Sequence, residues 1–192
     1  PVHVNMAFRE PLSGTFDSAI FDGLAATIAE PSARLAVATT IPITPNTVVV
    51  AGHGAGRAAE ETARALGAPL LAEVSSGAHF GRNLVVAYRQ LLASEEFGGR
   101  VQRVIVFGHP TLSREIPQLI QREGVQTIVV NGQGPEAFNP GHLVTRFVDA
   151  IQVVEGQDAA DPAWLGSWVT ASRELLAENP VDQLANARTD DR

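Results

Sequence analysis

Three histidines and three arginines stand in this sequence where an α/β sheet presents its ligand-binding groups. Each histidine follows an apolar run that is typical of a strand, and an arginine comes shortly after each one. The six residues are His53, His79 and His109, followed by Arg57, Arg82 and Arg114. Such side chains can bind a small anion such as a carboxylate, hydrogen-bond neighbouring loops, or face a partner domain. We take His79, Arg82, His109 and Arg114 as a possible effector or anion rim.

Metal binding by the same histidines would require them to converge on one point. Nothing in the wide spacing of His53, His79 and His109 brings them together, so we predict no metal site. The chain also has no cysteine, which excludes a disulfide framework, thiol catalysis and cysteine-ligated zinc.

A glycine-rich turn, AGHGAGR, follows the first predicted strand of the sheet. Gly52 and Gly54 stand as in a dinucleotide-binding fingerprint, and Glu73 comes about twenty residues later, where an acid would bind ribose. The third fingerprint position is Arg57, however, and Gly56 comes one place early. Because doubly wound folds also use glycine to turn from strand to helix, we predict a structural strand-end turn at Gly52, Gly54 and Gly56. Nucleotide binding remains the alternative.

Nucleophilic and acid–base chemistry have less support in this sequence. No G-x-S-x-G elbow occurs, and Ser75 and Ser76 stand at a strand-to-loop corner, where hydroxyls usually bond the local backbone. Glu60 and Glu61 are expected on the solvent-facing side of a helix, so they do not form a carboxylate pair on the rim. We therefore predict no catalytic residue in this chain.

The elements that would position these residues alternate between strands and helices. Strands are predicted at 47–54, 69–74, 103–108 and 125–131, with a fifth at 145–154. Helices are predicted at 57–66, 84–93, 113–124 and 161–179, the last capped by Asp161 with Pro162 at its first position. Nearly continuous apolar strands separated by helices are typical of a parallel sheet covered on both faces. We predict an α/β fold with an open, mostly parallel, doubly wound (Rossmann-like) sheet, in which the first four strands are neighbours and share one carboxyl edge.

The chain divides into four predicted parts. It opens with PVHVNM, whose alternation is typical of a strand, and Pro11 ends that pattern. We interpret 1–12 as the end of a preceding domain, 13–46 as an irregular connector, 47–179 as the α/β domain and 180–192 as a polar tail. A finished strand at the very first residue indicates either that processing exposed Pro1 or that the chain was cut from a longer protein.

Composition limits the class of protein. The 192 residues include 14 Lys+Arg and 21 Asp+Glu, a net charge of −7 that disfavours nucleic-acid binding through phosphate neutralisation. No apolar run approaches the ~20 residues of a membrane span, and no signal sequence opens the chain. We therefore expect a cytoplasmic protein with no membrane span and no nucleic-acid partner.

Four segments together resemble one known family. PVHVNMAFREPL is similar to the junction between the first and central domains of the thiamine-diphosphate-dependent menaquinone-pathway enzymes, the 2-succinyl-5-enolpyruvyl-6-hydroxy-3-cyclohexene-1-carboxylate synthases (MenD). VVVAGHGAG, PLLAEVSSGAHFG and VIVFGHPTLSRE resemble successive strand–loop segments of that central domain. The resemblance covers residues 1–12 and 47–130, in order. It implies an open parallel sheet with a strand number of about six, located between two thiamine-diphosphate domains of the same polypeptide.

The resemblance also implies what the parent enzyme would do. The parent would decarboxylate 2-oxoglutarate and add the succinyl unit to isochorismate as a homo-oligomer, with thiamine diphosphate and Mg²⁺ as cofactors. The family's Gly-Asp-Gly cofactor motif does not occur anywhere in this sequence. We therefore expect no cofactor in this fragment, which would be inactive alone and would serve as a non-catalytic scaffold or effector domain. The alternative is a free-standing nucleotide- or dinucleotide-binding Rossmann-like domain.

One departure from the family pattern concerns the rim. At His79 and His109 the resemblance implies arginine in many related sequences. Histidine is neutral or charged depending on pH, so this departure weakens the anion-binding interpretation of the rim.

Overall fold

The computed structural model describes residues 37–130, 138–154 and 160–178, together with residues 17, 19, 22 and 23. The chain divides into two units, Pro1–Leu35 and Ala36–Arg192, and the α/β fold belongs to the second unit. The predicted strand within 1–12, most of the 13–46 connector and the tail at 180–192 lie outside the described residues, so these interpretations stay predictions.

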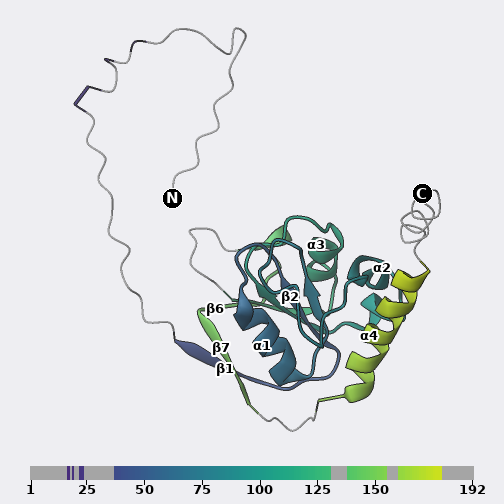
Figure 1. The fold of residues 1–192 in the computed structure, drawn as a ribbon. Helices are drawn as coiled ribbons and strands as arrows, with labels where there is room; N and C mark the ends of the chain where they lie inside the picture. Colours follow the sequence, from purple (N-terminus) through teal and green to yellow (C-terminus); the bar gives the residue numbers. More distant parts are fainter. Residues whose placement is uncertain are drawn as a thin grey trace, which may run out of the picture. The chain divides into compact units, whose positions relative to one another are not determined.

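Five strands form one parallel sheet (Figure 1). They are β2 (Thr47–Ala51), β3 (Leu70–Ala72), β4 (Arg103–Phe107), β5 (Gln126–Val130) and β6 (Arg146–Val148), in the order β3-β2-β4-β5-β6. Every neighbouring pair in this sheet is parallel. Val48, Val49 and Val50 of β2 are fully buried, because both faces of the sheet are covered. The predicted parallel alignment of the four strands between residues 47 and 131 is confirmed.

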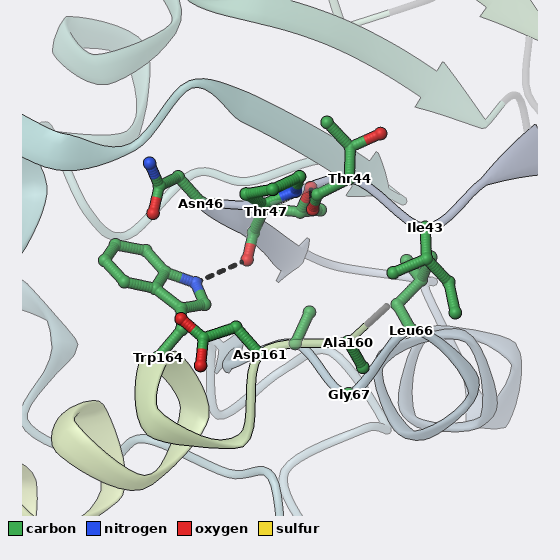
Figure 2. Close-up of a pocket in the computed structure, with 11 residues that line it drawn as sticks. Ile43, Thr44, Asn46, Thr47, Leu66, Gly67, Ala160, Asp161 and Trp164 are labelled. Carbon is green, nitrogen blue, oxygen red and sulfur yellow. Dashed lines mark hydrogen bonds between the residues drawn. The ribbon is translucent and has the colours of Figure 1, made fainter. Parts of the chain in front are cut away.

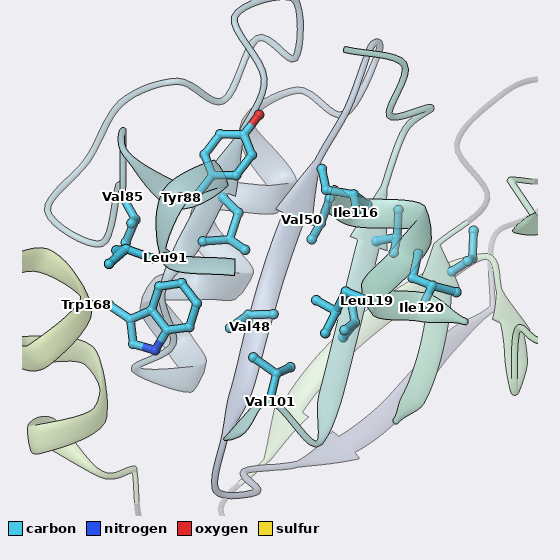
Figure 3. Close-up of a cluster of buried hydrophobic side chains, with 14 of the residues drawn as sticks. Val48, Val50, Val85, Tyr88, Leu91, Val101, Ile116, Leu119, Ile120 and Trp168 are labelled. Carbon is cyan, nitrogen blue, oxygen red and sulfur yellow. The ribbon is translucent and has the colours of Figure 1, made fainter. Parts of the chain in front are cut away.

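Helices cover both faces of this sheet, as the doubly wound prediction requires. They are α1 (Arg57–Leu66), α2 (Tyr88–Leu92), α3 (Glu115–Ile120) and α4 (Pro162–Ala177). Side chains alternate between the faces of a strand, so β2 contributes to two hydrophobic clusters. Val48 and Val50 pack with side chains of α2, α3 and α4 (Figure 3), whereas Val49 and Ala51 pack with side chains of α1.

The last helix begins as the sequence predicts. Pro162 is its first residue, and Oδ1 of Asp161 accepts a hydrogen bond from the N–H of Ala163 at 2.9 Å. The indole Nε1 of Trp164 donates to the carbonyl of Thr47 at 2.9 Å. This bond ties α4 to the start of β2, where the strand enters the sheet.

The second helix is shorter than the predicted span of 84–93. It begins at Tyr88, because Leu84 forms an isolated parallel bridge with Leu70 of β3. The buried Asn83 holds this segment by donating from Nδ2 to the carbonyls of Ala63 (3.0 Å) and Ala68 (2.9 Å). Residues 83–85 therefore extend the sheet edge beside β3. The third helix, α3, is likewise shorter than the predicted 113–124.

A second, two-stranded parallel sheet corrects two predictions. β1 (Ala38–Pro42) forms within the segment predicted to be an irregular connector, and it pairs with β7 (Ala150–Val154). The single strand predicted at 145–154 is thus two strands, β6 in the main sheet and β7 beside α1 (Figure 1). Ile41 and the partly buried Ile151 pack on the α1 cluster, so burying these side chains favours the extra pair.

Short 3₁₀ turns complete the described elements, at Gly98–Arg100 and Pro140–His142. Across the described ranges, no helix has the length and apolar character needed to cross a membrane.

Candidate functional site at the carboxyl edge of the sheet

The loops after β2, β3 and β4 emerge at one edge of the main sheet, because its strands all run in the same direction. The chain passes from β2 to β3 on one side and then to β4 on the other, which makes this edge the topological switch point. Open α/β sheets bind ligands in the crevice at such a point.

The four rim residues are exposed on two of these loops. His79 and Arg82 follow β3, and His109 and Arg114 follow β4. Because β2 lies between β3 and β4, the strands that carry the two loops are two strand spacings apart, roughly 10 Å. A shared anion-binding role for the four side chains stays a prediction.

Backbone hydrogen bonds join the loop after β2 to the loop after β4. The N–H of His53 donates to the carbonyl of His109 at 3.0 Å, and the N–H of His109 donates to the carbonyl of His53 at 2.9 Å. This antiparallel bridge sets the two histidines opposite each other, although β2 and β4 are parallel. Sequence reasoning did not pair them. The available signal was that each follows a glycine at a strand end, Gly52 and Gly108.

Close approach of the β4 loop explains Gly52. A Cβ at this position would lie 2.1 Å from the backbone nitrogen of Pro110 and 2.3 Å from the carbonyl carbon of His109. Gly108 is constrained in the same way by the β2 loop, since a Cβ at this position would lie 2.3 Å from the carbonyl oxygen of His53. Neighbouring backbone therefore occupies the space in front of both glycines.

The other two glycines turn the chain into α1. Gly54 and Gly56 have φ angles of 76° and 66°, in the left-handed region that favours glycine. The N–H of Gly56 donates to the carbonyl of Ser76 at 2.8 Å, which ties this turn to the loop after β3. The geometry of AGHGAGR is thus accounted for by contacts within the protein.

The carboxylate of Glu73 joins the loop after β3 to the loop after β4. Glu73 directly follows β3 and is 2 % exposed. Its Oε2 accepts from the N–H of Thr111 at 3.0 Å, and its Oε1 accepts from the N–H of Leu112 at 2.8 Å. Because β2 lies between the two strands, this side chain reaches across the end of β2. Both oxygens of the acid considered for ribose binding are therefore engaged by backbone.

Two aromatic contacts hold side chains at this edge. The guanidinium carbon of Arg57 lies 5.9 Å from the ring centroid of Phe80, a cation–π arrangement. The ring of His109 meets the buried Phe138 edge-on, with the two centroids 5.2 Å apart. These contacts hold one arginine at the start of α1 and one histidine of the β4 loop.

The expectation that Glu60 faces solvent is wrong. Its residue exposure is 8 %, because Gly81 of the loop after β3 packs on it. A Cβ on Gly81 would lie 2.7 Å from Oε1 of Glu60, and the same oxygen lies 3.7 Å from Nε of Arg64. Glu61 is exposed, as expected.

Tyr88 and Ser113 form a buried polar contact on the α2–α3 side of the sheet. Their hydroxyl oxygens lie 2.7 Å apart. Burial raises the pKa of Tyr88, the hydrogen bond with Ser113 lowers it, and the negative charge of Glu73 raises it; the net shift of this pKa is upward. The phenol is therefore held neutral.

Glu115 at the start of α3 interacts with two arginines. Nε of Arg89 lies 3.3 Å from its Oε2. Burial opposes its ionisation, but its own backbone N–H, the hydrogen bond and charge of Arg89, and the charge of Arg114 outweigh burial and lower its pKa. Part of the charge of the rim residue Arg114 is thus balanced within the domain.

A cavity of about 230 Å³ lies at the switch point. The loop glycines Gly54 and Gly108, Phe107 of β4, Ala58 of α1 and Ile151 of β7 contribute to its lining. It is smaller than the ~300–1,000 Å³ that is usual for pockets holding drug-sized ligands.

A pocket at the opposite edge is smaller still (Figure 2). It lies between the start of β2, the end of α1 and the start of α4, with Thr47, Leu66 and Trp164 in its lining. Its volume of about 10 Å³ has room for roughly one water molecule, so it is no candidate ligand site.

The family resemblance implies a magnesium–diphosphate site for the parent enzyme, and the Gly-Asp-Gly motif of that site does not occur in this sequence. Within 37–130, 138–154 and 160–178, no three histidine, aspartate or glutamate side chains gather closely enough to hold a metal ion. We therefore assign no chemical step in this chain to either cofactor.

The parallel strand order and the glycine turns at the switch point define an α/β domain of the Rossmann-like class. No family model matches the chain. Over 92% of its length, it is 51% identical to the 2-succinyl-5-enolpyruvyl-6-hydroxy-3-cyclohexene-1-carboxylate synthase of Leifsonia xyli subsp. xyli. Over 93% of its length, it is 53% identical to the synthase of the same name from Clavibacter michiganensis subsp. michiganensis. The chain belongs to this synthase family, as its sequence motifs predict.

The match covers only part of each relative. The synthase of Nocardioides sp. is 38% identical over 92% of this chain. The aligned segments make up 30%, 32% and 33% of the three relatives, so the chain spans about a third of the length of the curated relatives it matches.

Proposed function

We propose that this chain is the non-catalytic central domain of a 2-succinyl-5-enolpyruvyl-6-hydroxy-3-cyclohexene-1-carboxylate synthase. In this role, residues 47–179 form a scaffold between two thiamine-diphosphate domains of the same polypeptide. The parent enzyme would be a homo-oligomer that uses thiamine diphosphate and Mg²⁺ to decarboxylate 2-oxoglutarate and add the succinyl unit to isochorismate. Family membership and the one-third share of the relatives' length support this proposal.

The observation that carries the scaffold role is the engagement of Glu73. A nucleotide-binding domain would need an acid free to contact ribose at the end of its second strand. In this chain both carboxylate oxygens accept backbone hydrogen bonds from Thr111 and Leu112, and Gly52 is covered by the backbone of the β4 loop. This arrangement favours a scaffold over the alternative of a free-standing nucleotide-binding domain.

Turnover measurements test the proposal. The purified chain and the full-length synthase are each incubated with 2-oxoglutarate, isochorismate, thiamine diphosphate and Mg²⁺. We expect turnover by the full-length enzyme and none by the chain, and measurable turnover by a clean preparation of the chain would overturn the non-catalytic role. Titration of the chain with NAD, FAD and ADP tests the alternative of a nucleotide-binding domain. Saturable binding of any one of these nucleotides would support that alternative.

Binding of a small carboxylate effector is a second candidate function. The observation that favours it is the placement of charge, since His79, Arg82, His109 and Arg114 are all exposed on loops of one edge. Arginine binds carboxylates through paired, charge-assisted hydrogen bonds.

Calorimetry on the full-length synthase, with benzoate as the probe carboxylate, tests the effector role. The double substitution Arg82→Ala with Arg114→Ala should abolish binding. The control pair, Arg146→Ala with Arg173→Ala, also removes two exposed arginines and should leave binding unchanged. No binding by the unsubstituted synthase would end the effector proposal.

A further inference from the structure

The loops after β2, β3 and β4 at the carboxyl edge are rich in histidine and arginine. We call residues 53–57, 74–82 and 109–114 the carboxyl-edge face. Each loop contributes one histidine and one arginine, and none contains an aspartate or glutamate, in a chain whose net charge is −7. Two acids adjoin this face. Glu73 is buried and its oxygens are engaged by backbone, so it does not offset the charge at the surface, whereas Glu115 balances part of the charge of Arg114.

The same face also exposes large apolar side chains. Val74 is 78 % exposed, Leu112 55 % and Phe80 41 %. Val74 and Phe80 follow β3 and Leu112 follows β4, on the two loops that Glu73 joins. Large apolar side chains exposed on one part of a surface are typical of interaction surfaces. The face thus combines the two features of a protein-binding surface, apolar contact area and a charged rim.

Contacts within the domain hold this face in one arrangement. Glu73 bonds the backbone of Leu112, which brings the loop with Val74 to the loop with Leu112. The His53–His109 backbone bridge joins the β2 loop to the β4 loop. A surface held in place before binding loses little conformational entropy when a partner docks.

We propose that the carboxyl-edge face docks onto an acidic, apolar-centred surface in the part of the synthase that lies outside this chain. The inference rests on the proposed function, because the partner is a flanking domain of the same polypeptide. Charge complementarity selects the chemistry of that surface. A small carboxylate alone would engage the cations but would leave Val74 and Leu112 exposed, whereas a docked domain covers both.

Labelling of histidines by diethyl pyrocarbonate, read by mass spectrometry, tests this docking. His53, His79 and His109 lie on the face, and His142 is an exposed histidine outside it that serves as the internal control. We expect labelling of the three to be slower in the full-length synthase than in the isolated chain by roughly tenfold, which corresponds to a docked state favoured by about 1.4 kcal/mol. His142 should react equally in both.

A charge-reversal variant of the full-length synthase makes the test independent of the isolated chain. Arg82→Glu with Arg114→Glu should restore fast labelling of His79 and His109, because two like charges would then face the acidic partner. The matched pair Arg146→Glu with Arg173→Glu, which lies outside the face, should leave the slow rates unchanged. Fast labelling of all three histidines in the unsubstituted synthase would overturn the docking proposal.

Two other occupants of the carboxyl-edge face, a second copy of the chain and a small anion, would give distinct labelling results, and either result would overturn the docking proposal. Protection that appears in the isolated chain and rises with its concentration would identify a second copy as the occupant. Protection that appears in the synthase only when benzoate is added would identify an anion site alone. Failure of docking is distinguishable from failure of the proposed function, since turnover by the full-length enzyme and none by the chain would leave the non-catalytic role standing.

Discussion

The side chain of Glu73 holds the backbone of Leu112, with Oε1 accepting the Leu112 N–H at 2.8 Å, although the residues lie on loops from non-adjacent strands. The second oxygen accepts from the N–H of Thr111 at 3.0 Å. One buried carboxylate therefore satisfies two backbone donors and fixes the loop between β4 and α3. That loop carries His109 and ends with Arg114, so Glu73 helps to fix the position of these two rim residues.

The substitution Glu73→Gln tests this role. The amide keeps one acceptor oxygen but presents its NH₂ group to a backbone donor, so one partly buried N–H loses its partner. We expect the free energy of unfolding to fall by about 1–3 kcal/mol in urea titrations. Amide hydrogen exchange at Thr111 and Leu112 should also become faster. The control Glu61→Gln, on the exposed side of α1, should change neither; an unchanged exchange rate in Glu73→Gln would contradict the role.

Gly52 and Gly54 give a matched pair of substitutions to alanine. At Gly52 the new Cβ would meet the backbone nitrogen of Pro110 at 2.1 Å, so the β4 loop must move; we expect a loss of roughly 3 kcal/mol, as for an overpacked core. At Gly54 no atom lies within 4 Å of the new Cβ, and only the positive φ is unfavourable, which costs about 1–2 kcal/mol. Chemical denaturation measures both, and a smaller loss at Gly52 than at Gly54 would contradict the packing explanation.

Tyr88 is the only tyrosine in the chain, so absorbance at 295 nm follows its ionisation alone. We expect a titration midpoint above the ordinary value of 10.0, mainly because the phenol is buried. Ser113→Ala should move the midpoint higher still, since the Ser113 hydrogen bond lowers this pKa. A midpoint at or below 10 in the folded chain would show that Tyr88 is not in the buried setting described.

The raised pKa of Tyr88 also predicts how the free energy of unfolding depends on pH in alkaline solution. Because the folded-state pKa of Tyr88 lies above the unfolded value, its contribution to stability is fully present below pH 10 and is lost as pH rises through the folded-state pKa. Unfolding titrations at stepped pH should show this loss, and Tyr88→Phe should remove the part due to this group. Equal alkaline slopes in the two proteins would contradict the assignment.

Glu115 predicts the opposite dependence in acid. The folded-state pKa of Glu115 is lowered, so the contribution of its carboxylate to the free energy of unfolding is present above the ordinary pKa of 4.5. This contribution is lost as pH falls through the folded-state pKa. Arg89→Ala removes the hydrogen bond and charge that favour the carboxylate, and should raise this pKa toward the ordinary value. A carboxyl ¹³C titration by NMR measures it directly. An unchanged midpoint in Arg89→Ala would show that the ion pair does not form in solution.

Local patterns in the sequence are sufficient to predict most of the main sheet. The β-branched runs ending in Gly52 and Gly108 are strands, and Asp161 and Pro162 mark the start of α4. These features depend on residues close together in the chain, where propensity and capping act. The turn after Val148, which divides the predicted last strand into β6 and β7, depends instead on pairing with the distant β1.

Long-range contacts also explain what sequence reasoning misses at the edge. The spacing of Glu73 from Gly52 suggests a ligand-binding acid, but the partners of Glu73 are backbone groups 38 and 39 residues away. The helical pattern places Glu60 toward solvent, and only the path of the loop through Gly81 buries it. Neither contact can be predicted from a local pattern, because the partners are backbone groups or a glycine that lie far away in the sequence.

The proposed scaffold role requires that this chain supply no cofactor site of the parent synthase. Isothermal titration calorimetry with thiamine diphosphate and Mg²⁺, carried out in parallel on the chain and on the full-length enzyme, tests this requirement most directly. We expect saturable binding by the full-length synthase and no saturable binding by the chain. Saturable binding of thiamine diphosphate by the chain alone would contradict the scaffold role.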